Sequence, residues 1–515
     1  MRYFSTRGGG PSLSFEETVL TGLAPDGGLY IPETIPSLPH NWQTEWASYS
    51  FVDLSVAVLS LYISRSEISE SDLRALVQKS YATFRHPDTT PLVQLDEKRF
   101  VLELFHGPTF AFKDVALQLL GNLFEFFLLR RNARKQPGEK PEKLTVVGAT
   151  SGDTGSAAIY GLRNKANISI FILHPKGRVS PIQEAQMTTV TDANVHNIAV
   201  QGTFDDCQDI VKTLFGDAEF NATHRLGAVN SINWARILAQ TVYYFLAYFQ
   251  AQPKLGNKAQ ELQFVVPTGN FGDILAGYYA KRMGLPMGKL VVATNANDIL
   301  ARFWNAGKYE KVDSDLPVSD GKQSGVKETL SPAMDILVSS NFERLLWYLA
   351  YENAADNKAA GCATLAGWMS KMKTDGRVEI PVAVLESARR DFLATRISDK
   401  QTLETIRAHF EATPSYVADP HTAVGLAAAK IVASTSPQII LSTAHPAKFS
   451  EAVAQALKTN SSFDFERDIL PPEFVGLLDK KRNVEDVPRP DVNLVKAVIE
   501  HFAAVDPSPT TITGV

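Results

Sequence analysis

Cysteine is scarce in this chain, where only Cys207 and Cys362 occur among 515 residues. Neither belongs to a CxxC pair or to a Cys/His cluster with metal-ligand spacing, which argues against a disulfide scaffold and a bound metal. Long apolar runs are missing as well: none approaches the ~20 residues that span a bilayer, and the opening MRYFSTRGGG lacks the apolar core of a signal peptide. We therefore expect a cytoplasmic protein with no membrane partner.

A surplus of positive charge is also absent. The chain has 51 Lys and Arg residues against 56 Asp and Glu, a formal net charge of −5, and its basic residues are scattered. This distribution argues against a nucleic-acid partner. Nucleotide-binding signatures are missing too, because no GxGxxG motif occurs and no Lys-Ser or Lys-Thr pair follows a glycine-rich loop. Any anionic ligand must then be held by a local site.

The length of the chain and the change in its hydrophobic pattern predict two or three domains. Hydrophobic residues make up 44% of the chain, enough to fill more than one core. The first 90 residues carry amphipathic helical stretches at 14–22, 51–63 and 70–81. From residue 91, short β-branched runs alternate with helical patterns, which is typical of parallel α/β units. The predicted segments are a mainly helical region at 1–90, a smaller domain at 91–260, a larger domain at 261–485, and a C-terminal helix with a disordered tail at 486–515.

The alternating pattern predicts an α/β fold with two doubly wound parallel-sheet domains beside the helical N-terminal region. Strands are predicted at 100–105, 144–147, 168–173, 195–200, 263–266, 290–294 and 438–442. Helices are predicted at 114–131, 156–164, 205–215, 233–251 and 273–283. Clustered Ser, Asp, Gly and Lys residues predict a long loop at 308–331.

One lysine lies among aromatic residues in the segment Pro108-Thr109-Phe110-Ala111-Phe112-Lys113-Asp114-Val115. Burial disfavours the charged form of a lysine and lowers its pKa toward the range of a neutral nucleophile. Lys113 is therefore a candidate Schiff-base lysine. The alternative from these residues alone is that the ammonium group reaches water along an apolar stem.

A glycine-rich loop, Gly269-Asn270-Phe271-Gly272-Asp273, joins a predicted strand to a predicted helix. Glycines let successive N–H groups point at one anion, and the helix N-terminus adds partial positive charge. The loop is therefore a candidate phosphate site. A plain strand-to-helix turn capped by Asp273 is the alternative.

A second loop, Thr150-Ser151-Gly152-Asp153-Thr154-Gly155, has the same strand-to-helix setting. Its hydroxyl and N–H groups could hold a carboxylate. The alternative is a capping turn with Asp153 or Thr154 as the N-cap.

Polar groups end the buried strand predicted at 438–442, where Ser442 and Thr443 are followed by His445 and Lys448. Surface or capping roles explain the last two at least as well as a place near the site. Further polar clusters lie at 176–180, 230–236 and 419–422, and arginine suits a bidentate phosphate contact. Candidates for holding a substrate phosphate are Arg178, Ser180, Asn233 and Arg236.

These motifs, together with Asp26-Gly27-Gly28-Leu29-Tyr30-Ile31-Pro32, resemble those of threonine synthases of the long, fungal type, from about residue 1 to the low 480s. The resemblance implies a fold-type II pyridoxal 5′-phosphate enzyme, similar to the tryptophan synthase β subunit. It implies that Lys113 is catalytic and binds the cofactor. The implied cofactor-phosphate residues are Gly269, Asn270, Phe271, Gly272 and Asp273. Thr443 is implied at the pyridine nitrogen, with Ser442 the near competitor.

By the same resemblance, the loop residues Thr150, Ser151, Gly152, Asp153 and Thr154 hold the substrate carboxylate. Many relatives have Asn where this chain has Asp153, so the resemblance leaves open whether that side chain forms a hydrogen bond with the 3′-oxygen of the cofactor. The implied reaction converts O-phospho-L-homoserine and water to L-threonine and phosphate, by γ-elimination and addition of water at Cβ. The enzyme is expected to be a monomer.

Two alternatives remain. One is another pyridoxal-dependent enzyme of this fold, such as a serine/threonine dehydratase or a cysteine synthase, which the 26–32 segment and Asp153 disfavour. The other is a binding protein that holds a phosphorylated metabolite without turnover, which Lys113 disfavours.

Overall fold

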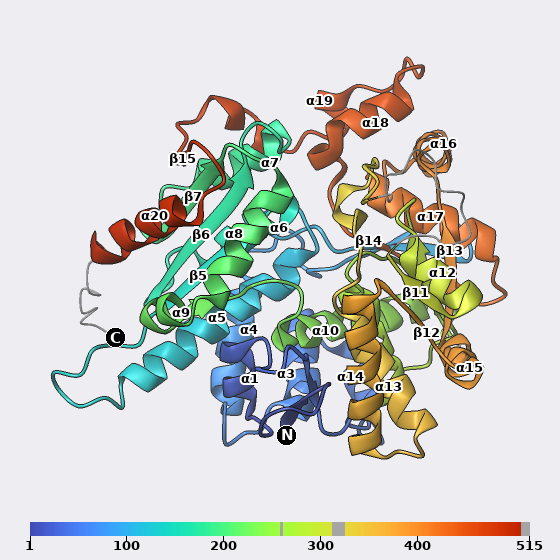
Figure 1. Ribbon diagram of the computed structural model, residues 1–515. Helices are drawn as coiled ribbons and strands as arrows, with labels where there is room; N and C mark the ends of the chain where they lie inside the picture. The colour runs from blue at the N-terminus through green and yellow to red at the C-terminus, as the bar shows by residue number, and fades with distance from the viewer. Residues whose placement is uncertain (258–260, 312–324, 506–515) are drawn as a thin grey trace.

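Two large β-sheets, one on each side of a central helix, organise the chain in the computed structural model (Figure 1). The structure describes residues 1–257, 261–311 and 325–505. In that part of the chain, the two large sheets have six and five strands, and two further sheets are two-stranded.

The six-stranded sheet is parallel except at one edge, where β3 pairs antiparallel with β4. Its central strands are apolar and buried, as expected when helices cover both faces of a parallel sheet. The strand order is β13 (Phe392–Arg396), β10 (Leu290–Thr294), β9 (Gln263–Pro267), β14 (Gln438–Ser442), β4 (Arg99–Glu103) and β3 (Leu92–Gln94). Its part of the chain carries α11 (Gly272–Met283), α12 (Ile299–Ala306), α13 (Phe342–Asn353), α14 (Lys358–Thr374), α15 (Val382–Asp391), α16 (Asp399–Phe410), α17 (Pro420–Val432), α18 (Ser450–Leu457) and α19 (Phe465–Asp468).

The five-stranded sheet is parallel throughout. Its order is β15 (Glu485–Val487), β7 (Val195–Val200), β6 (Ile168–Pro175), β5 (Leu144–Ala149) and β8 (Leu226–Gly227). The helices of this part of the chain are α5 (Lys113–Asn132), α6 (Asp153–Leu162), α7 (Pro181–Thr188), α8 (Phe204–Gly216), α9 (Ala218–His224) and α20 (Val492–Val505). The predicted fold class is thereby confirmed, and all the predicted strands and helices are present with ends moved by at most three residues.

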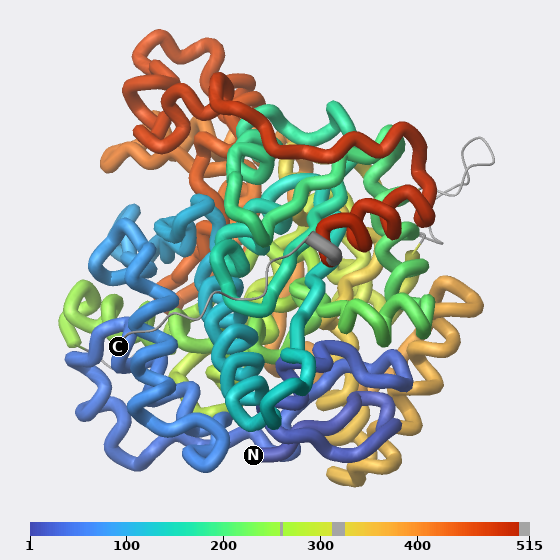
Figure 2. Tube along the Cα trace, turned by 90° about the vertical axis from the view of Figure 1, so that its left-hand side faces the viewer, coloured from blue at the N-terminus to red at the C-terminus, as the bar shows by residue number. Residues whose placement is uncertain are grey.

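The predicted domain boundaries do not follow the sheets. Strands β3 and β4 fall in the predicted smaller domain, 91–260, yet they complete the six-stranded sheet through the parallel pairing of β4 with β14. Strand β15 and helix α20 return the end of the chain to the five-stranded sheet, and Figure 2 shows this red segment crossing over the top of the molecule. Pairing between segments distant in sequence places β3 and β4 in one sheet and β15 in the other. The local hydrophobic pattern of a strand does not encode its pairing partner.

The region predicted as a long loop begins with β11 (Lys308–Glu310), which pairs with β12 (Arg377–Glu379). Residues 312–324 of this region and the tail at 506–515 lie outside the described residues. The remaining short 3₁₀ turns are η1 (Trp46–Ser48), η2 (Pro332–Met334), η3 (Pro446–Phe449), η4 (Pro472–Phe474) and η5 (Leu477–Asp479).

The N-terminal region is mainly helical, as predicted, with α1 (Phe15–Thr21), α2 (Trp42–Glu45), α3 (Phe51–Tyr62) and α4 (Glu70–Tyr81). A small antiparallel pair, β1 (Tyr3–Ser5) with β2 (Tyr30–Pro32), was not predicted. Ahead of β2, the Asp26 carboxylate accepts hydrogen bonds from the Gly9 and Gly28 N–H groups at 2.7 and 2.9 Å. The 26–32 motif therefore has a structural role in holding this strand pair.

Helix α10 (Trp234–Lys254) lies between the sheets and is buried along most of its length (Figure 1). It packs on α3, α5 and α11. A fully buried arginine on α13, Arg344, joins its start to the N-terminal region. The guanidinium group donates to Tyr30 O at 3.0 Å, Ile232 O at 2.7 Å and Asn341 Oδ1 at 2.5 Å. Three segments distant in sequence are thus held at one point.

We expect Arg344→Met to lower the free energy of unfolding by about 3 kcal/mol, because three buried acceptors would lose their donor. Urea unfolding followed by circular dichroism would measure the change. Arg74→Met is the matched control, because Arg74 forms a half-exposed ion pair with Asp53 at 2.7 Å. Pairs of that kind contribute no more than about 1 kcal/mol. Equal losses in the two variants would contradict the role assigned to Arg344.

Candidate active site

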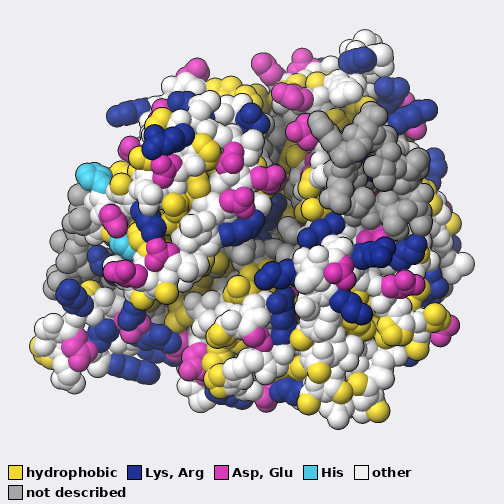
Figure 3. Space-filling view, viewed as in Figure 1, with side chains coloured by type: hydrophobic (Ala, Val, Ile, Leu, Met, Phe, Trp, Pro, Cys, Tyr) yellow, Lys and Arg dark blue, Asp and Glu magenta, His cyan; other side chains and the backbone are white. Residues whose placement is uncertain are grey.

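The carboxyl ends of three neighbouring parallel strands bring the main candidates together. Strands β4, β14 and β9 lie side by side, and they lead into Lys113, Thr443 and the 269–273 loop respectively. The Phe112 N–H group donates to Thr443 O at 2.8 Å, which fixes the first two segments to each other. Such an edge, outside the carboxyl ends of parallel strands, is where α/β proteins bind ligands. Figure 3 shows a hollow on this face with Lys and Arg side chains at its rim.

Lys113 is the first residue of α5, and its side chain is only 10% exposed. Its Nζ atom lies 3.9 Å from Asp153 Oδ2 and 4.9 Å from the centre of the Phe112 ring. Burial outweighs the attraction of Asp153 and lowers the pKa of Lys113 to about 8. The alternative of a solvated surface lysine is therefore wrong.

The loop ahead of Lys113 is held firmly from two sides. The Arg85 guanidinium lies 3.9 Å from the centre of the Phe110 ring and donates to Gly107 O and, at 3.2 Å, to Pro108 O. Asp114 accepts from Thr109 N at 2.8 Å and from Thr109 Oγ1 at 2.7 Å. These contacts keep Lys113 at a defined place at the head of its helix.

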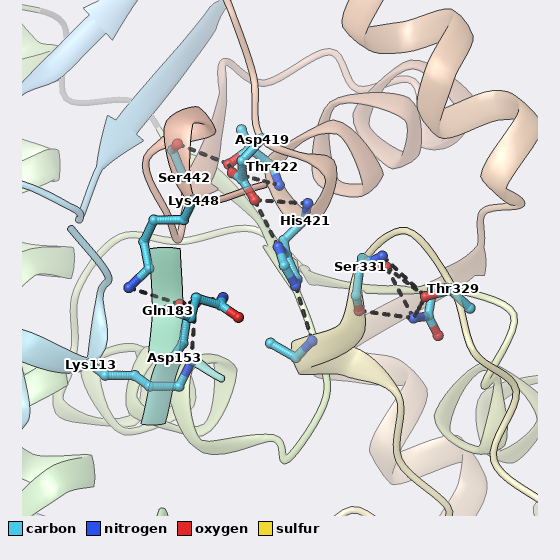
Figure 4. A network of polar contacts seen from close by, with 12 residues as sticks. Lys113, Asp153, Gln183, Thr329, Ser331, Asp419, His421, Thr422, Ser442 and Lys448 are labelled. Atoms are coloured by element: carbon cyan, nitrogen blue, oxygen red, sulfur yellow. Dashed lines mark hydrogen bonds and ion pairs between the residues drawn. The ribbon is translucent and has the colours of Figure 1, made fainter. Parts of the chain in front are cut away.

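The second loop brings its aspartate to the same place from the other sheet. Asp153 Oδ1 accepts from Lys448 Nζ at 2.8 Å and from Gln183 Nε2 at 3.0 Å (Figure 4). Burial raises the pKa of Asp153, but the charges of Lys448 and Lys113 outweigh burial and bring it down to about 2. Gly152 occupies the N-cap position, so the capping alternative for this loop is wrong.

Other members of the second loop are placed differently. Thr150 Oγ1 is occupied within the loop, where it accepts from the N–H groups of Gly152 and Gly155 at 3.0 Å each. Ser151 is exposed and Thr154 is half-buried. The predicted carboxylate role of the loop stays a prediction that its N–H groups and these two hydroxyls could fulfil.

The 269–273 loop presents unused donors at the start of α11. Within the described residues, the N–H groups of Asn270, Phe271, Gly272 and Asp273 have no acceptor. Phe271 adopts the left-handed conformation, with a φ of 63°, and its ring packs against Trp304 and Phe342. Successive unpaired N–H groups at a helix N-terminus form an anion site.

The side chain of Asp273 is turned away from the loop and into the core. Its Oδ1 atom accepts from Tyr243 OH at 2.5 Å and Tyr244 OH at 3.0 Å, both on α10. Burial raises the pKa of Asp273 to about 7. Phe271 holds the N-cap position, so the alternative of a turn capped by Asp273 is wrong. Only the backbone of Asp273 can contribute to anion binding.

Ser442 and Thr443 differ in how their hydroxyl groups are engaged. Ser442 Oγ lies 2.9 Å from Thr422 Oγ1, which also bonds to Asp419 (Figure 4). Tyr416 OH makes a further contact with Ser442 Oγ, at 3.4 Å. Thr443 Oγ1 makes no hydrogen bond in the described part of the chain. Thr443 is thus the residue with a hydroxyl group left for a ligand.

The four candidates for the substrate phosphate are not gathered in one cluster. Arg236 is buried on α10; Nη1 donates to Val229 O at 2.9 Å, and Nε has no partner among the described residues. The Asn233 amide caps α10 and donates to Val19 O. Arg178 is exposed, and Ser180 occupies the N-cap position of α7 with its hydroxyl unpaired in the described structure.

Lys448 is the main correction to the site. A surface or capping role was expected to explain it at least as well as a place near the site, but its side chain is fully buried against Asp153. The capping role is confirmed for His445, whose ring accepts from Ala447 N at 3.2 Å. Gln183 and Arg85 were not predicted at all. Neither belongs to a motif, and only the folded chain brings them to the site.

Three family models match the chain. "Threonine synthase N terminus" matches residues 2–81, "Pyridoxal-phosphate dependent enzyme" matches residues 84–355, and "Threonine synthase, C-terminal" matches residues 422–499.

Known proteins are similar over the full length. A threonine synthase of Schizosaccharomyces pombe is 58% identical over 505 residues, which cover 97% of each chain. The crystal structure of threonine synthase from yeast has a TM-score of 0.91 and 52% identity, covering 98% of this chain and 99% of that one. The structure of pyridoxal phosphate-bound threonine synthase from Brucella melitensis has a TM-score of 0.85 and 42% identity, with the same coverage.

The residues at the site fit pyridoxal phosphate. A buried amine is available at Lys113, unpaired N–H groups at the start of α11 suit a phosphate, and the free hydroxyl of Thr443 suits a ring nitrogen.

Thr443→Val should weaken the binding of pyridoxal phosphate about 3- to 10-fold, the value of one neutral hydrogen bond. Absorbance titration of the cofactor-free full chain would measure it. Ser442→Ala should leave the affinity within about twofold while it lowers stability, because its partners are internal. A larger affinity loss in Ser442→Ala would reverse the assignment.

Proposed function

This chain belongs to the threonine synthase family, whose members depend on pyridoxal phosphate, and we propose that it converts O-phospho-L-homoserine and water to L-threonine and inorganic phosphate. The observation that carries the proposal is full-length similarity combined with one buried, deprotonatable lysine at the carboxyl edge of the sheet. The reaction would be the last step in making threonine.

Each part of the site has a task in this reaction. Bound pyridoxal phosphate supplies an electron sink for the charge that develops at the substrate Cα. Lys113 holds the cofactor and, once released by the substrate, moves protons at Cα and Cβ. The N–H groups of 269–273 would hold the cofactor phosphate, and the Thr443 hydroxyl would serve the ring nitrogen. A neutral hydroxyl there leaves that nitrogen unprotonated, which limits the electron sink.

The substrate has two anionic groups that need partners. We assign its carboxylate to the loop at Thr150–Thr154, whose helix begins beside Lys113. We assign its phosphate to Arg236, because this buried guanidinium has no carboxylate partner among the described residues, and burial lowers its pKa to about 10. Ser180, Asn233 and Arg178 are second candidates, of which Asn233 is already engaged by Val19 O.

The remaining expectations concern the cellular setting. Within the described residues, no helix has both the length and the apolar character to cross a bilayer. Both cysteines are free and buried, which suits a reducing compartment such as the cytoplasm. We propose that the enzyme acts there as a monomer.

The first test is turnover of O-phospho-L-homoserine, with phosphate and threonine measured in the same reaction. Equal amounts of both products are expected from the wild type, and Lys113→Ala should lower the rate at least about 10²-fold, because it removes the group that moves protons. Phosphate without threonine, or turnover only of serine or threonine, would instead favour the alternative of a different eliminase of this fold.

Arg236→Met should lower kcat/KM for O-phospho-L-homoserine about 10- to 100-fold, through the loss of a charge-assisted contact with phosphate. The affinity for pyridoxal phosphate, titrated separately, should stay within about twofold if Arg236 serves the substrate and not the cofactor. Arg163→Met is the matched control, because Arg163 already pairs with Asp192 at 2.6 Å. An unchanged kcat/KM in Arg236→Met would remove Arg236 from the substrate site.

A further inference from the structure

Lys448 makes a second buried lysine at the site. Its side chain is fully buried in η3, just after β14. Its Nζ atom lies 2.8 Å from Asp153 Oδ1 and donates to Thr109 O at 2.8 Å. One ammonium group therefore connects η3, the loop ahead of Lys113 and the start of α6. Figure 4 shows its ion pair with Asp153. A buried lysine is stable only with such partners.

Asp153 is shared unequally between two lysines. Its Oδ1 atom accepts from Lys448 at 2.8 Å, a hydrogen-bonded ion pair, whereas its Oδ2 atom lies 3.9 Å from Lys113 Nζ. One carboxylate can compensate only one ammonium group fully. Since burial disfavours the uncompensated charge, the more distant lysine is the one that gives up its proton.

We propose that Lys448 is a positioning residue that keeps Asp153 occupied, so that Lys113 presents an uncharged amine to the aldehyde of the cofactor. Without Lys448, Asp153 would have Lys113 as its nearest cation and would hold it in the charged, unreactive form. The inference rests on the role proposed above for Lys113.

Other charged groups around the two lysines also raise or lower the pKa of Lys113. Arg236 on α10 and Lys448 both lower the pKa of Lys113, by repulsion. Asp114, whose carboxylate accepts hydrogen bonds from Thr109, raises the pKa of Lys113 less than Asp153 does. The ring of His421 on α17 is engaged elsewhere, since Nε2 accepts from Ala333 N at 3.1 Å and Nδ1 lies 2.7 Å from Asp419 Oδ1. Of the two carboxylates, Asp153 has the larger effect on Lys113 and is the one that Lys448 contacts.

The test is competitive labelling of the cofactor-free full chain with trace acetic anhydride from about pH 6 to about pH 10, because only an uncharged amine reacts. Mass spectrometry would give the labelling of Lys113 relative to Lys400, whose side chain is 85% exposed. The wild-type curve should have its midpoint near pH 8, because burial lowers the pKa of Lys113 to about 8. No phosphohomoserine is used, so failure here is separate from failure of the proposed reaction.

Lys448→Met should move the midpoint for Lys113 up by about one pH unit or more, the effect of an unshared carboxylate. The double variant Asp153→Asn/Lys448→Met removes both charges, leaves no unpaired ion, and should return the midpoint to the wild-type value or below. Lys281→Met is the matched control, since Lys281 also contacts one carboxylate, Asp391 at 2.8 Å, and one carbonyl, Gly288 O at 3.2 Å.

A wild-type midpoint in Lys448→Met would overturn the proposal, even if the variant were less stable, since a merely structural lysine leaves the titration of Lys113 unchanged. The proposal would also fall if the double variant kept the shift of the single one, because Asp153 would then not transmit the effect. If Lys448→Met does not fold, the double variant decides: a midpoint above the wild-type value contradicts the proposal.

Discussion

The burial of several ionisable groups around one edge of the sheet is the constraint on which the site depends. Lys113, Lys448 and Arg236 are all buried around one edge of the sheet, and Asp153 is the carboxylate that Lys448 contacts there. Unpaired buried charge is costly unless another ion compensates it. The cofactor and the proposed substrate both carry phosphate, and the substrate adds a carboxylate. The groups that such anions would meet are the Arg236 guanidinium, whose Nε has no partner among the described residues, and the unpaired N–H groups of the 269–273 loop.

Local sequence predicted the parts of the site better than their assembly. The loops after β5 and β9 could be read from glycines flanked by apolar runs, because that chemistry is local. The pairing of β4 with β14 joins segments more than 300 residues apart, and no pattern in either strand encodes it. Lys448 was undervalued for the same reason, since its partners Asp153 and Thr109 come from distant parts of the chain.

The N-terminal region contributes through the placement of α10. Asn233, the N-cap of that helix, is tied to Val19 O, and Arg344 joins Ile232 to Tyr30. The start of α10 is therefore fixed by segments that carry no chemistry, and Arg236 lies in its first turn. A guanidinium group needs such fixing if it is to meet a phosphate in one geometry. This explains physically why a region remote from Lys113 belongs to the catalytic body.

Two unfavourable features distinguish the 269–273 loop, namely backbone strain at Phe271 and N–H groups without an acceptor in the described chain. Phe271 is held in the left-handed region, which is unfavourable for a bulky residue, and the aromatic packing of its ring compensates. An unpaired backbone N–H group costs free energy in the folded state. A ligand that accepts hydrogen bonds from these N–H groups would remove that cost. A phosphate that accepts these bonds binds the folded state and not the unfolded one. If this loop holds the cofactor phosphate, as proposed above, cofactor binding and stability are coupled through it.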